Sequence, residues 1–358
     1  MISFVTGVDP VKNYTMEQRT EIAEFGEFGL ITHLTRNFEI QNASTILGVG
    51  DDAAVIDHFG KQTVITTDLL IEGVHFDLTY TPLRHLGYKS VIVNLSDVYA
   101  MNAMPTQITM SIGLSNRFSV EAIDEFYEGV YAACEKYGVD LVGGDTASSQ
   151  KGFIISVTAM GEVVQDKLVK RSGAKKGDLL CCSGDLGAAY IGLLFLEREK
   201  KIYIENPQIQ PDLEGEDFVI RRLLKPEARK DIFEFFEEKG ILPTSMMDIS
   251  DGLSSEILHI CEQSGVGAVI FEEKLPIHDD ARRAAYKFQI DPTACALSGG
   301  EDYELLFTLK QEDYEKVLLN EQISIIGHID DIEKGATIIT KGGNTHQITA
   351  QGWNAFKK

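Results

Sequence analysis

The chain has 358 residues, and its 33 Lys and Arg against 55 Asp and Glu give a formal net charge of −22 at pH 7. This balance argues against nucleic acid as a partner, because binding a phosphate backbone needs clustered cations, and against docking on an anionic membrane surface. A hydrophobic content of 44% with 25% charged residues is typical of a folded globular protein. A chain of this length predicts roughly two domains, each with its own core.

The sequence predicts a cytoplasmic protein. Its first ten residues lack a basic region followed by an apolar stretch, so no signal peptide is expected. The longest apolar run, residues 188–196, is far shorter than a membrane-spanning helix. The five cysteines are scattered without a Cys-x-x-Cys pair, and the adjacent Cys181 and Cys182 lie in an apolar run typical of core packing. Reduced thiols and no zinc site are therefore expected.

The first third of the chain predicts alternating helices and strands. Apolar residues at helical spacing predict an early helix through Phe28, Ile31, Leu34 and Phe38. Strands are predicted at 52–56 and 62–67. Thr81 and Pro82 predict the N-cap and first turn of a helix that ends before Pro105.

The next segment predicts a strand, a helix and two further strands. Alternating apolar residues predict a strand at 108–114 with one buried face. Ser119 is predicted to cap the helix that follows. That helix would bury a stripe of Val120, Ile123, Tyr127, Val130 and Cys134. Residues 139–142 and 153–164 predict the last strands of this unit.

A basic stretch at 167–178 predicts the junction between two domains. It contains five Lys or Arg and two Gly, and it separates an N-terminal α/β domain at 1–166 from a C-terminal α/β domain at 167–358. In the second half we expect a strand at 179–183, helices at 186–200 and 218–239, a strand at 245–249 and a helix at 254–264. The polar residues 201–217 predict a loop or insertion. The predicted fold class is mixed α/β, with two tandem α/β domains.

A subset of aspartates lies at the ends of segments otherwise suited to burial. Its members are Asp51, Asp52, Asp68, Asp97, Asp145, Asp248 and Asp251. Each alone could be a turn former or a helix cap, because Asp is favoured in both positions. Partly buried carboxylates brought close together cannot all stay ionised without cations, and hard divalent ions prefer oxygen ligands. The set predicts Mg²⁺-dependent work on a polyphosphate, with Thr66 and Thr67 as further oxygen donors.

Glycine-rich segments match the common nucleotide-binding loops poorly. Residues 48–53 fit the dinucleotide pattern G-x-G-x-x-A, but two carboxylates would face the pyrophosphate, and strand-like residues follow where a helix is required. Neither a Walker A loop nor a protein-kinase catalytic loop occurs in the sequence. Two glycine pairs, 143–144 and 299–300, stand beside acidic residues. They suit a backbone pressed against a ligand or metal, with a tight turn as the alternative.

Seven motifs follow one another along the chain. They are Gly-Val-Gly-Asp-Asp-Ala-Ala (48–54), Thr-Thr-Asp-Leu-Leu-Ile-Glu-Gly-Val-His-Phe (66–76), Val-Asn-Leu-Ser-Asp-Val (93–98), Gly-Gly-Asp-Thr (143–146), Met-Asp-Ile-Ser-Asp-Gly-Leu (247–253), Gly-Gly-Glu-Asp-Tyr-Glu-Leu-Leu-Phe (299–307) and Gly-Trp (352–353). In this order they resemble the thiamine-monophosphate kinase family, from about Gly26 to the end of the chain. The leader before Gly26 and residues 201–217 depart from the family pattern without touching a motif.

The resemblance implies a fold, an activity and a set of site residues. The fold would be aminoimidazole ribonucleotide synthetase-like, with two α/β domains and a homodimer joined through N-terminal strands. The activity would be direct transfer of the γ-phosphoryl group of ATP to thiamine monophosphate, giving thiamine diphosphate, with several Mg²⁺ ions and no catalytic residue beyond the metal ligands.

Carried over by motif, the implied residues form three groups. The Mg²⁺ ligands would be Asp52, Thr66, Thr67, Asp68, Asp97, Asp145, Asp248 and Asp251. The contacts to ATP would be Tyr127, Gly144, Asp145, Arg171 and Ser250. The contacts to thiamine monophosphate would be His75, Glu301 and Trp353.

Four of these residues have a structural alternative. Arg171 lies in a basic loop and could be a solvated charge, His75 could be a structural histidine, and Trp353 could pack in a core. Tyr127 lies on an apolar helix stripe, where core packing is the default. For the whole chain, two other functions stay open: another ATP-dependent enzyme of the same superfamily, or a non-catalytic divalent-metal-binding protein.

Overall fold

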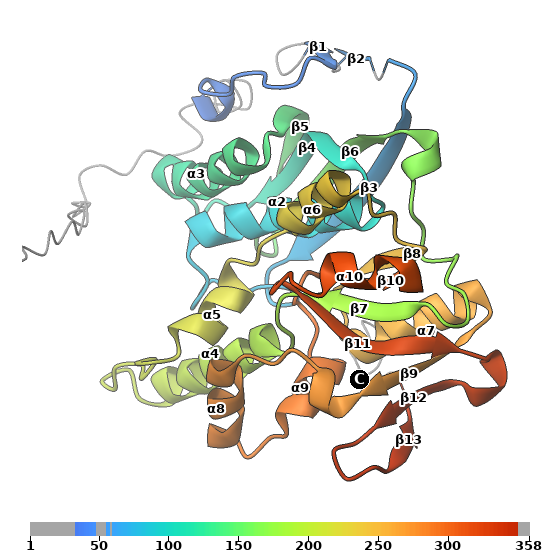
Figure 1. The fold of residues 1–358 in the computed structure, drawn as a ribbon. Coiled ribbons are helices and arrows are strands. Elements are labelled where there is room, and N and C mark those ends of the chain that lie inside the picture. The colour runs from blue at the N-terminus through green and yellow to red at the C-terminus, as the bar shows by residue number, and fades with distance from the viewer. Residues whose placement is uncertain (1–32, 48–54, 58, 350–358) are drawn as a thin grey trace, which may run out of the picture.

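The computed structural model describes residues 33–47, 55–57 and 59–349, and two sheets organise it (Figure 1). The first sheet has four strands in the spatial order β3 (Gln62–Ile71), β6 (Ile154–Val163), β4 (Met104–Leu114) and β5 (Asp140–Ser148). Strand β4 runs parallel to β5 and antiparallel to β6. A separate antiparallel pair joins β1 (Thr45–Leu47) to β2 (Val55–Ile56).

Two long helices, α2 (Leu83–Ala100) and α3 (Val120–Tyr137), cover one face of the first sheet. The alternation predicted for β4 is confirmed, because Ile108, Met110 and Ile112 are buried in the same core cluster as these helices. The other face of this sheet is not covered by a described helix, and Ile65 and Leu69 of β3 are 64% and 50% exposed there.

Local sequence signals account for the ends of α3 but not for the start of α2. Ser119 caps α3, as predicted, by accepting a 3.3 Å hydrogen bond from Ala122 N, and Gly138 ends the helix in the left-handed conformation. The prediction that Thr81 caps α2 is wrong. Pro82 occupies the N-cap position with extended backbone and no side-chain cap bond, so the helix begins at Leu83.

The second sheet has seven strands. Their spatial order is β13 (Thr345–Gln347), β12 (Ala336–Ile339), β9 (Gly267–Phe271), β11 (Ile323–Asp330), β7 (Leu179–Ser183), β10 (Glu304–Leu309) and β8 (Ser245–Ile249). Neighbouring strands are antiparallel except β12 and β9. Strands β7 and β8 have the bounds predicted from sequence, and Cys181 and Cys182 of β7 are buried, as are the other three cysteines.

The helices of the second half are α4 (Ala188–Glu205), α5 (Asp217–Leu224), α6 (Lys230–Lys239), α7 (Leu253–Ser264), α8 (Asp279–Lys287), α9 (Pro292–Ser298) and α10 (Tyr314–Val317). Short 3₁₀ turns lie at Gln165–Lys167, Glu272–Lys274, Gln311–Asp313 and Ile332–Lys334. The single helix predicted at 218–239 is wrong, because Pro226 lacks a backbone N–H and separates α5 from α6. The predicted loop at 201–217 is shorter than expected, since α4 continues to Glu205.

The two halves of the chain meet along α2. The core cluster of the first half includes Ala228, Phe233 and Tyr303, which belong to the second half. The last strand of the first sheet ends at Val163 and the first strand of the second sheet begins at Leu179, on either side of the predicted junction. Within the described ranges, no helix combines the length and the apolar character needed to cross a membrane.

Candidate functional site

Helix α2 brings polar side chains into the seam between the two halves. The helix is buried nearly all round, as expected for one without a polar face. Four of its polar residues are no more than 4% exposed: Lys89, Ser90, Asn94 and Ser96. Buried polar groups need partners, and three of these four reach residues of β3, β8 or the turn before β10.

Strand β3 supplies the partners on the N-terminal side of the seam. Thr66 Oγ1 donates a 2.6 Å hydrogen bond to Asp97 Oδ2, and Asp68 N donates a 3.0 Å bond to Asn94 Oδ1. Alternate residues of a strand share a face, so Thr66 and Asp68 both face α2. Thr67 faces away from the helix, and its Oγ1 donates to Val157 O of β6 at 3.0 Å. The structure therefore does not bring the Thr67 hydroxyl to the seam.

Strand β8 brings a third carboxylate to the same place. Asp248 is 5% exposed, and its Oδ2 accepts a 2.8 Å hydrogen bond from Ser96 Oγ of α2. Burial, together with repulsion from the Asp97 and Asp68 carboxylates, raises the pKa of Asp248 to about 7, against the Ser96 hydrogen bond. Three predicted metal ligands from β3, α2 and β8 are thus close enough to repel one another.

The pKa values of the other two carboxylates, Asp68 and Asp97, are raised as well. Burial raises the pKa of Asp68 to about 6, with added repulsion from Asp97 and Glu301. Burial also raises the pKa of Asp97, opposed by the Thr66 hydrogen bond and the charge of Arg171. Arg171 is exposed, but its positive charge opposes the rise in pKa of both Asp97 and Asp248. The structure brings this predicted residue beside the aspartates.

The donor set fits Mg²⁺ that arrives with a phosphate ligand. In the part of the chain that the structure describes, no three His, Cys, Asp or Glu side chains converge tightly enough to enclose a metal ion by themselves. Mg²⁺ keeps several waters and usually takes only one or two carboxylates together with substrate phosphates. Asp68, Asp97 and Asp248 lie on separate elements, and their raised pKa values show that the ionised carboxylates are disfavoured without a cation. Such ligands suit this mode of binding. The predicted ligand Asp52 lies outside the described residues.

The segment after β8 packs against the turn before β10. Glu301 N donates a 2.7 Å hydrogen bond to Ser250 O, which extends the β8–β10 pairing beyond the strand ends. Gly300 has φ +71°, and a Cβ there would lie 2.5 Å from Ser250 O, so only glycine fits this close approach. Asp251 lies in the same segment, where burial and the Glu301 charge raise its pKa. Three predicted residues, Ser250, Asp251 and Glu301, are therefore neighbours.

The predicted substrate contacts His75 and Glu301 lie beside the aspartates. His75 Nδ1 accepts a 3.1 Å hydrogen bond from Ile71 N, so the neutral ring carries its proton on Nε2. Burial lowers the pKa of His75, the Lys89 charge lowers it further, and the Glu301 charge opposes both. Lys89 Nζ donates to Glu301 Oε2 and to Leu223 O, the latter at 3.1 Å. Trp353, the third predicted contact, lies outside the described residues.

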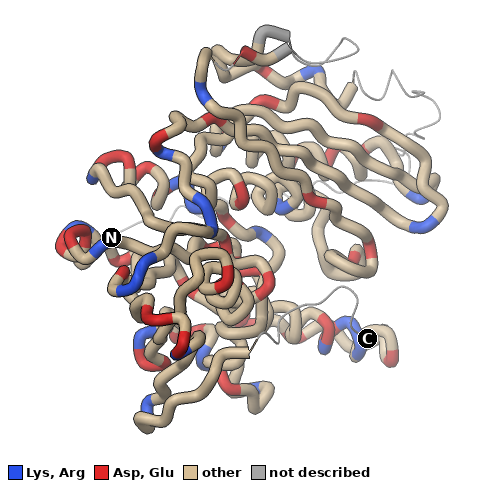
Figure 2. The backbone as a smooth tube through the Cα atoms, turned by 90° about the vertical axis from the view of Figure 1, so that its right-hand side faces the viewer, with Lys and Arg blue, Asp and Glu red and all other residues tan. Residues whose placement is uncertain are grey.

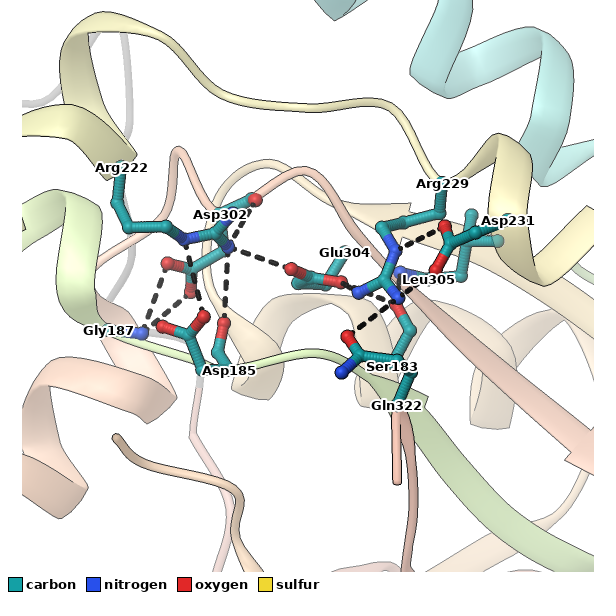
Figure 3. A network of polar contacts seen from close by, with 10 residues as sticks. All are labelled: Ser183, Asp185, Gly187, Arg222, Arg229, Asp231, Asp302, Glu304, Leu305 and Gln322. Carbon is teal, nitrogen blue, oxygen red and sulfur yellow. Dashed lines mark hydrogen bonds and ion pairs between the residues drawn. The ribbon is translucent and has the colours of Figure 1, made fainter. Parts of the chain in front are cut away.

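A buried polar network in the second half of the chain holds the turn before β10 in place (Figure 3). Glu304 is 2% exposed, and its carboxylate accepts hydrogen bonds from Arg222, Arg229 and Ser183. Asp302, which is fully buried, accepts bonds of 2.9 and 3.1 Å from Gly187 N. The acidic residues at 302 and 304 therefore anchor the turn in the second half, while the one at 301 faces α2.

Besides Thr67, three further predicted residues are not brought to the seam. Asp145 of β5 lines a hollow of about 500 Å³ with Ser111 and Ser156, its neighbours on the uncovered face of the first sheet. Gly144 precedes it on the same strand and is exposed. Tyr127 is buried in the core, where its ring meets that of Phe126 at 5.7 Å. For Tyr127 the structure matches the core alternative, and a contact with ATP stays a prediction.

Sequence reasoning missed four residues of this region: Lys89, Ser96, Glu256 and Tyr303. Glu256 Oε1 accepts a 3.0 Å hydrogen bond from Asp251 N, and the carboxyl group is buried with its pKa raised to about 8 by desolvation. A charged residue within an otherwise apolar helix was the available signal for Lys89, since lysine is rarely buried without a partner. The partners themselves come from distant segments and leave no local pattern.

Comparisons with known proteins place this geometry in a family context. Residues 50–163 match the AIR synthase related protein, N-terminal domain family. The chain is 35% identical to a thiamine-monophosphate kinase of Aquifex aeolicus over 335 residues, which cover 94% of this chain and 99% of the relative. It is 32% identical to a thiamine-monophosphate kinase of Bacillus subtilis, covering 92% and 99%. A solved structure of AaThiL complexed with AMPPCP and TMP has a TM-score of 0.71 at 33% identity, covering 94% of this chain and 99% of that one.

Proposed function

Because the chain belongs to the thiamine-monophosphate kinase family, we propose that it transfers the γ-phosphoryl group of ATP to thiamine monophosphate, giving thiamine diphosphate and ADP. The observation that carries this proposal is the convergence of Asp68, Asp97 and Asp248 from three separate elements beside His75 and Glu301. The similarity to a structure holding AMPPCP, an ATP analogue, together with TMP supports both substrates.

We propose that Asp68, Asp97 and Asp248 hold Mg²⁺ when ATP is bound. The family motifs also name Asp52, Thr66 and Asp251 as ligands, together with Thr67 and Asp145, whose side chains lie on the uncovered face of the first sheet and not at the seam. Bound Mg²⁺ supplies positive charge that neutralises the phosphate oxygens, which is the main requirement of phosphoryl transfer. An acidic seam without cations would repel a polyphosphate. Arg171 adds the positive charge of the chain itself next to Asp97 and Asp248, and Ser250, which directly follows β8, is a further proposed contact to ATP.

The acceptor needs positioning more than proton abstraction. The attacking phosphate oxygen of thiamine monophosphate is already anionic, so no dedicated base is required, and the proposal assigns none. Glu301 offers a carboxylate to the cationic thiamine moiety. His75 has a lowered pKa and stays neutral, so it can orient the substrate through hydrogen bonds without adding charge. Trp353 is proposed to cover the thiazolium ring by a cation–π contact.

We propose that the protein forms a homodimer through the uncovered face of the first sheet. The exposed Ile65 and Leu69 lie on this face, and Figure 2 shows that its strands carry few charged residues. A partner sheet would bury these side chains and close the hollow beside Asp145, where Gly144 and Asp145 are the proposed contacts to ATP. We also propose that the chain divides into two domains between residues 166 and 167 and that the protein is cytoplasmic.

The experiment that tests the function is incubation of the full chain with ATP, Mg²⁺ and thiamine monophosphate, with thiamine diphosphate followed by chromatography. Product that requires all three components is expected. Folded protein that binds ATP with Mg²⁺ but forms no thiamine diphosphate would overturn the kinase activity and favour the non-catalytic alternative. Turnover of ATP only with another acceptor would favour a different enzyme of the superfamily.

A further inference from the structure

We propose that Lys89 is a positioning residue that fixes the Glu301 carboxylate against the acceptor and thereby sets the affinity for thiamine monophosphate. The inference rests on the proposed function, because it assigns Glu301 to the acceptor side of the site. It adds a residue outside the seven motifs, on the stretch of α2 that precedes the motif at 93–98.

Lys89 is a buried charge that is paired with a carboxylate. Its side chain is 5% exposed, and burying an ammonium group is costly unless it is paired and hydrogen-bonded. Both of its partners, Leu223 O and the Glu301 carboxylate, belong to the second half of the chain, whereas Lys89 belongs to the first. The contact therefore spans the seam in which the substrates are proposed to bind.

The backbone of Glu301 is already fixed without Lys89. Its N–H is bonded to Ser250 O, its φ is +63°, and the adjoining Gly300 packs against the Ser250 carbonyl. Left-handed backbone at a non-glycine residue persists only where its surroundings determine it, and the network around Asp302 and Glu304 supplies that support (Figure 3). The Glu301 side chain is held separately, by the Lys89 ammonium group and by a hydrogen bond with the Tyr303 side chain.

Glu301 also acts electrostatically on the whole site. Its carboxylate acts to raise the pKa of neighbouring groups, which include Asp68, His75, Asp251 and Tyr303. Lys89 neutralises this carboxylate on the side facing α2. Without Lys89, the unpaired Glu301 would add a negative charge to a seam that must admit the phosphate of thiamine monophosphate. Loss of Lys89 should therefore weaken binding of the acceptor more than binding of ATP.

The test compares Lys89→Met, Lys89→Arg and the double variant Lys89→Met/Glu301→Gln with the wild-type chain. For Lys89→Met we expect KM for thiamine monophosphate to rise roughly tenfold or more, while the affinity for Mg²⁺ and AMPPCP measured without acceptor stays within about twofold. Lys89→Arg keeps the charge and should recover part of the loss. The double variant should bind the acceptor no worse than Lys89→Met, because both members of the pair are gone.

Lys287→Met is the matched control. Lys287 also forms a close ion pair with a buried glutamate, Glu216, but that pair lies outside the site residues. It should leave both affinities unchanged, and thermal unfolding reports whether each variant is folded. An unchanged KM for the acceptor in folded Lys89→Met, or an equal loss of AMPPCP affinity, would overturn this inference alone. A wild-type chain that forms no thiamine diphosphate would instead overturn the proposed function and this inference with it.

Discussion

Ser96 and Asp248 lie 152 residues apart in the chain and share a hydrogen bond of 2.8 Å. The bond joins α2, from the half that carries the first sheet, to β8 at the edge of the second sheet. It also reaches one of the three carboxylates that converge at the seam, and the pKa of this carboxylate is raised to about 7. The same bond therefore holds the two halves together and favours the ionised form that a metal ligand needs.

The first prediction concerns Ser96→Ala. Removing the hydroxyl leaves the buried Asp248 without its donor, which should lower the free energy of unfolding by about 1–3 kcal/mol. It should also raise the Mg²⁺ concentration needed for half-maximal turnover, because Asp248 then ionises less readily. Urea unfolding and Mg²⁺ titration of turnover measure the two effects. Ser90→Ala is the control, since Ser90 Oγ donates to Gly87 O within α2; an equal Mg²⁺ dependence in both variants would contradict the account.

The second prediction concerns Asp97→Asn. The change removes a carboxylate that repels Asp68 and Asp248, so the metal-free protein should unfold at the same temperature as the wild type or at a higher one. Turnover should fall by roughly a hundredfold or more, because phosphoryl transfer depends on neutralised phosphate charge. The exposed Glu128→Gln on α3 should change neither quantity. Full activity in Asp97→Asn would remove Asp97 from the metal site.

The third prediction concerns pH. The pKa values of Asp68 and Asp248 are raised from 3.8 to about 6 and about 7, so the folded, metal-free protein holds protons that the unfolded chain has lost. Their contribution to stability is therefore largest at low pH and decreases as pH rises from about 4 to about 7. Mg²⁺ must displace these protons, so the stabilisation that it gives should grow over the upper part of this range.

Thermal unfolding with and without Mg²⁺ between about pH 5.5 and pH 8 checks the third prediction. The difference between wild type and Asp248→Asn isolates this group from the other carboxylates of the chain. Mg²⁺ stabilisation that is equal at every pH, or that decreases as pH rises, would show that these aspartates do not bind the ion.

The fourth prediction concerns the homodimer. Leu69→Lys places a charge on the uncovered face of the first sheet, on the edge strand β3, where a partner would have to bury it without compensation. Analytical ultracentrifugation should show a dimer for the wild type and a monomer for this variant at the same concentration. Leu319→Lys is the control, because Leu319 is 89% exposed elsewhere on the chain. A dimer that survives Leu69→Lys would place the interface on another surface.

Local patterns predicted much of the fold. Ser119 begins α3 as predicted, because a cap residue acts within a few positions of the helix end. The short apolar runs of β7 and β8 likewise needed no tertiary information. The Thr81 prediction was wrong because a proline with φ near −60° suits either the N-cap or the first turn, and its ψ, which decides between them, is 137° and therefore extended.

The site was less predictable because its contacts connect distant segments. The face on which Asp145 lies depends on pairing between β4 and β5, where a register irregularity falls between Ile108 and Thr109, and one residue of slip exchanges the faces of a strand. The pairing of Lys89 with Glu301 spans 212 residues. Motifs could mark Glu301 as a site residue, but only the folded chain identifies the cation that holds it.

Direct transfer of the γ-phosphoryl group from ATP to thiamine monophosphate is tested most directly by following that group itself. ATP labelled at the γ-phosphorus is incubated with the full chain, Mg²⁺ and thiamine monophosphate, and the label is traced among nucleotide, protein and thiamine products. We expect the label to appear in thiamine diphosphate in step with ADP, no label to stay on the protein, and Asp97→Asn to abolish the transfer. Label released only as free phosphate, or retained on the folded protein, would contradict direct transfer to thiamine monophosphate.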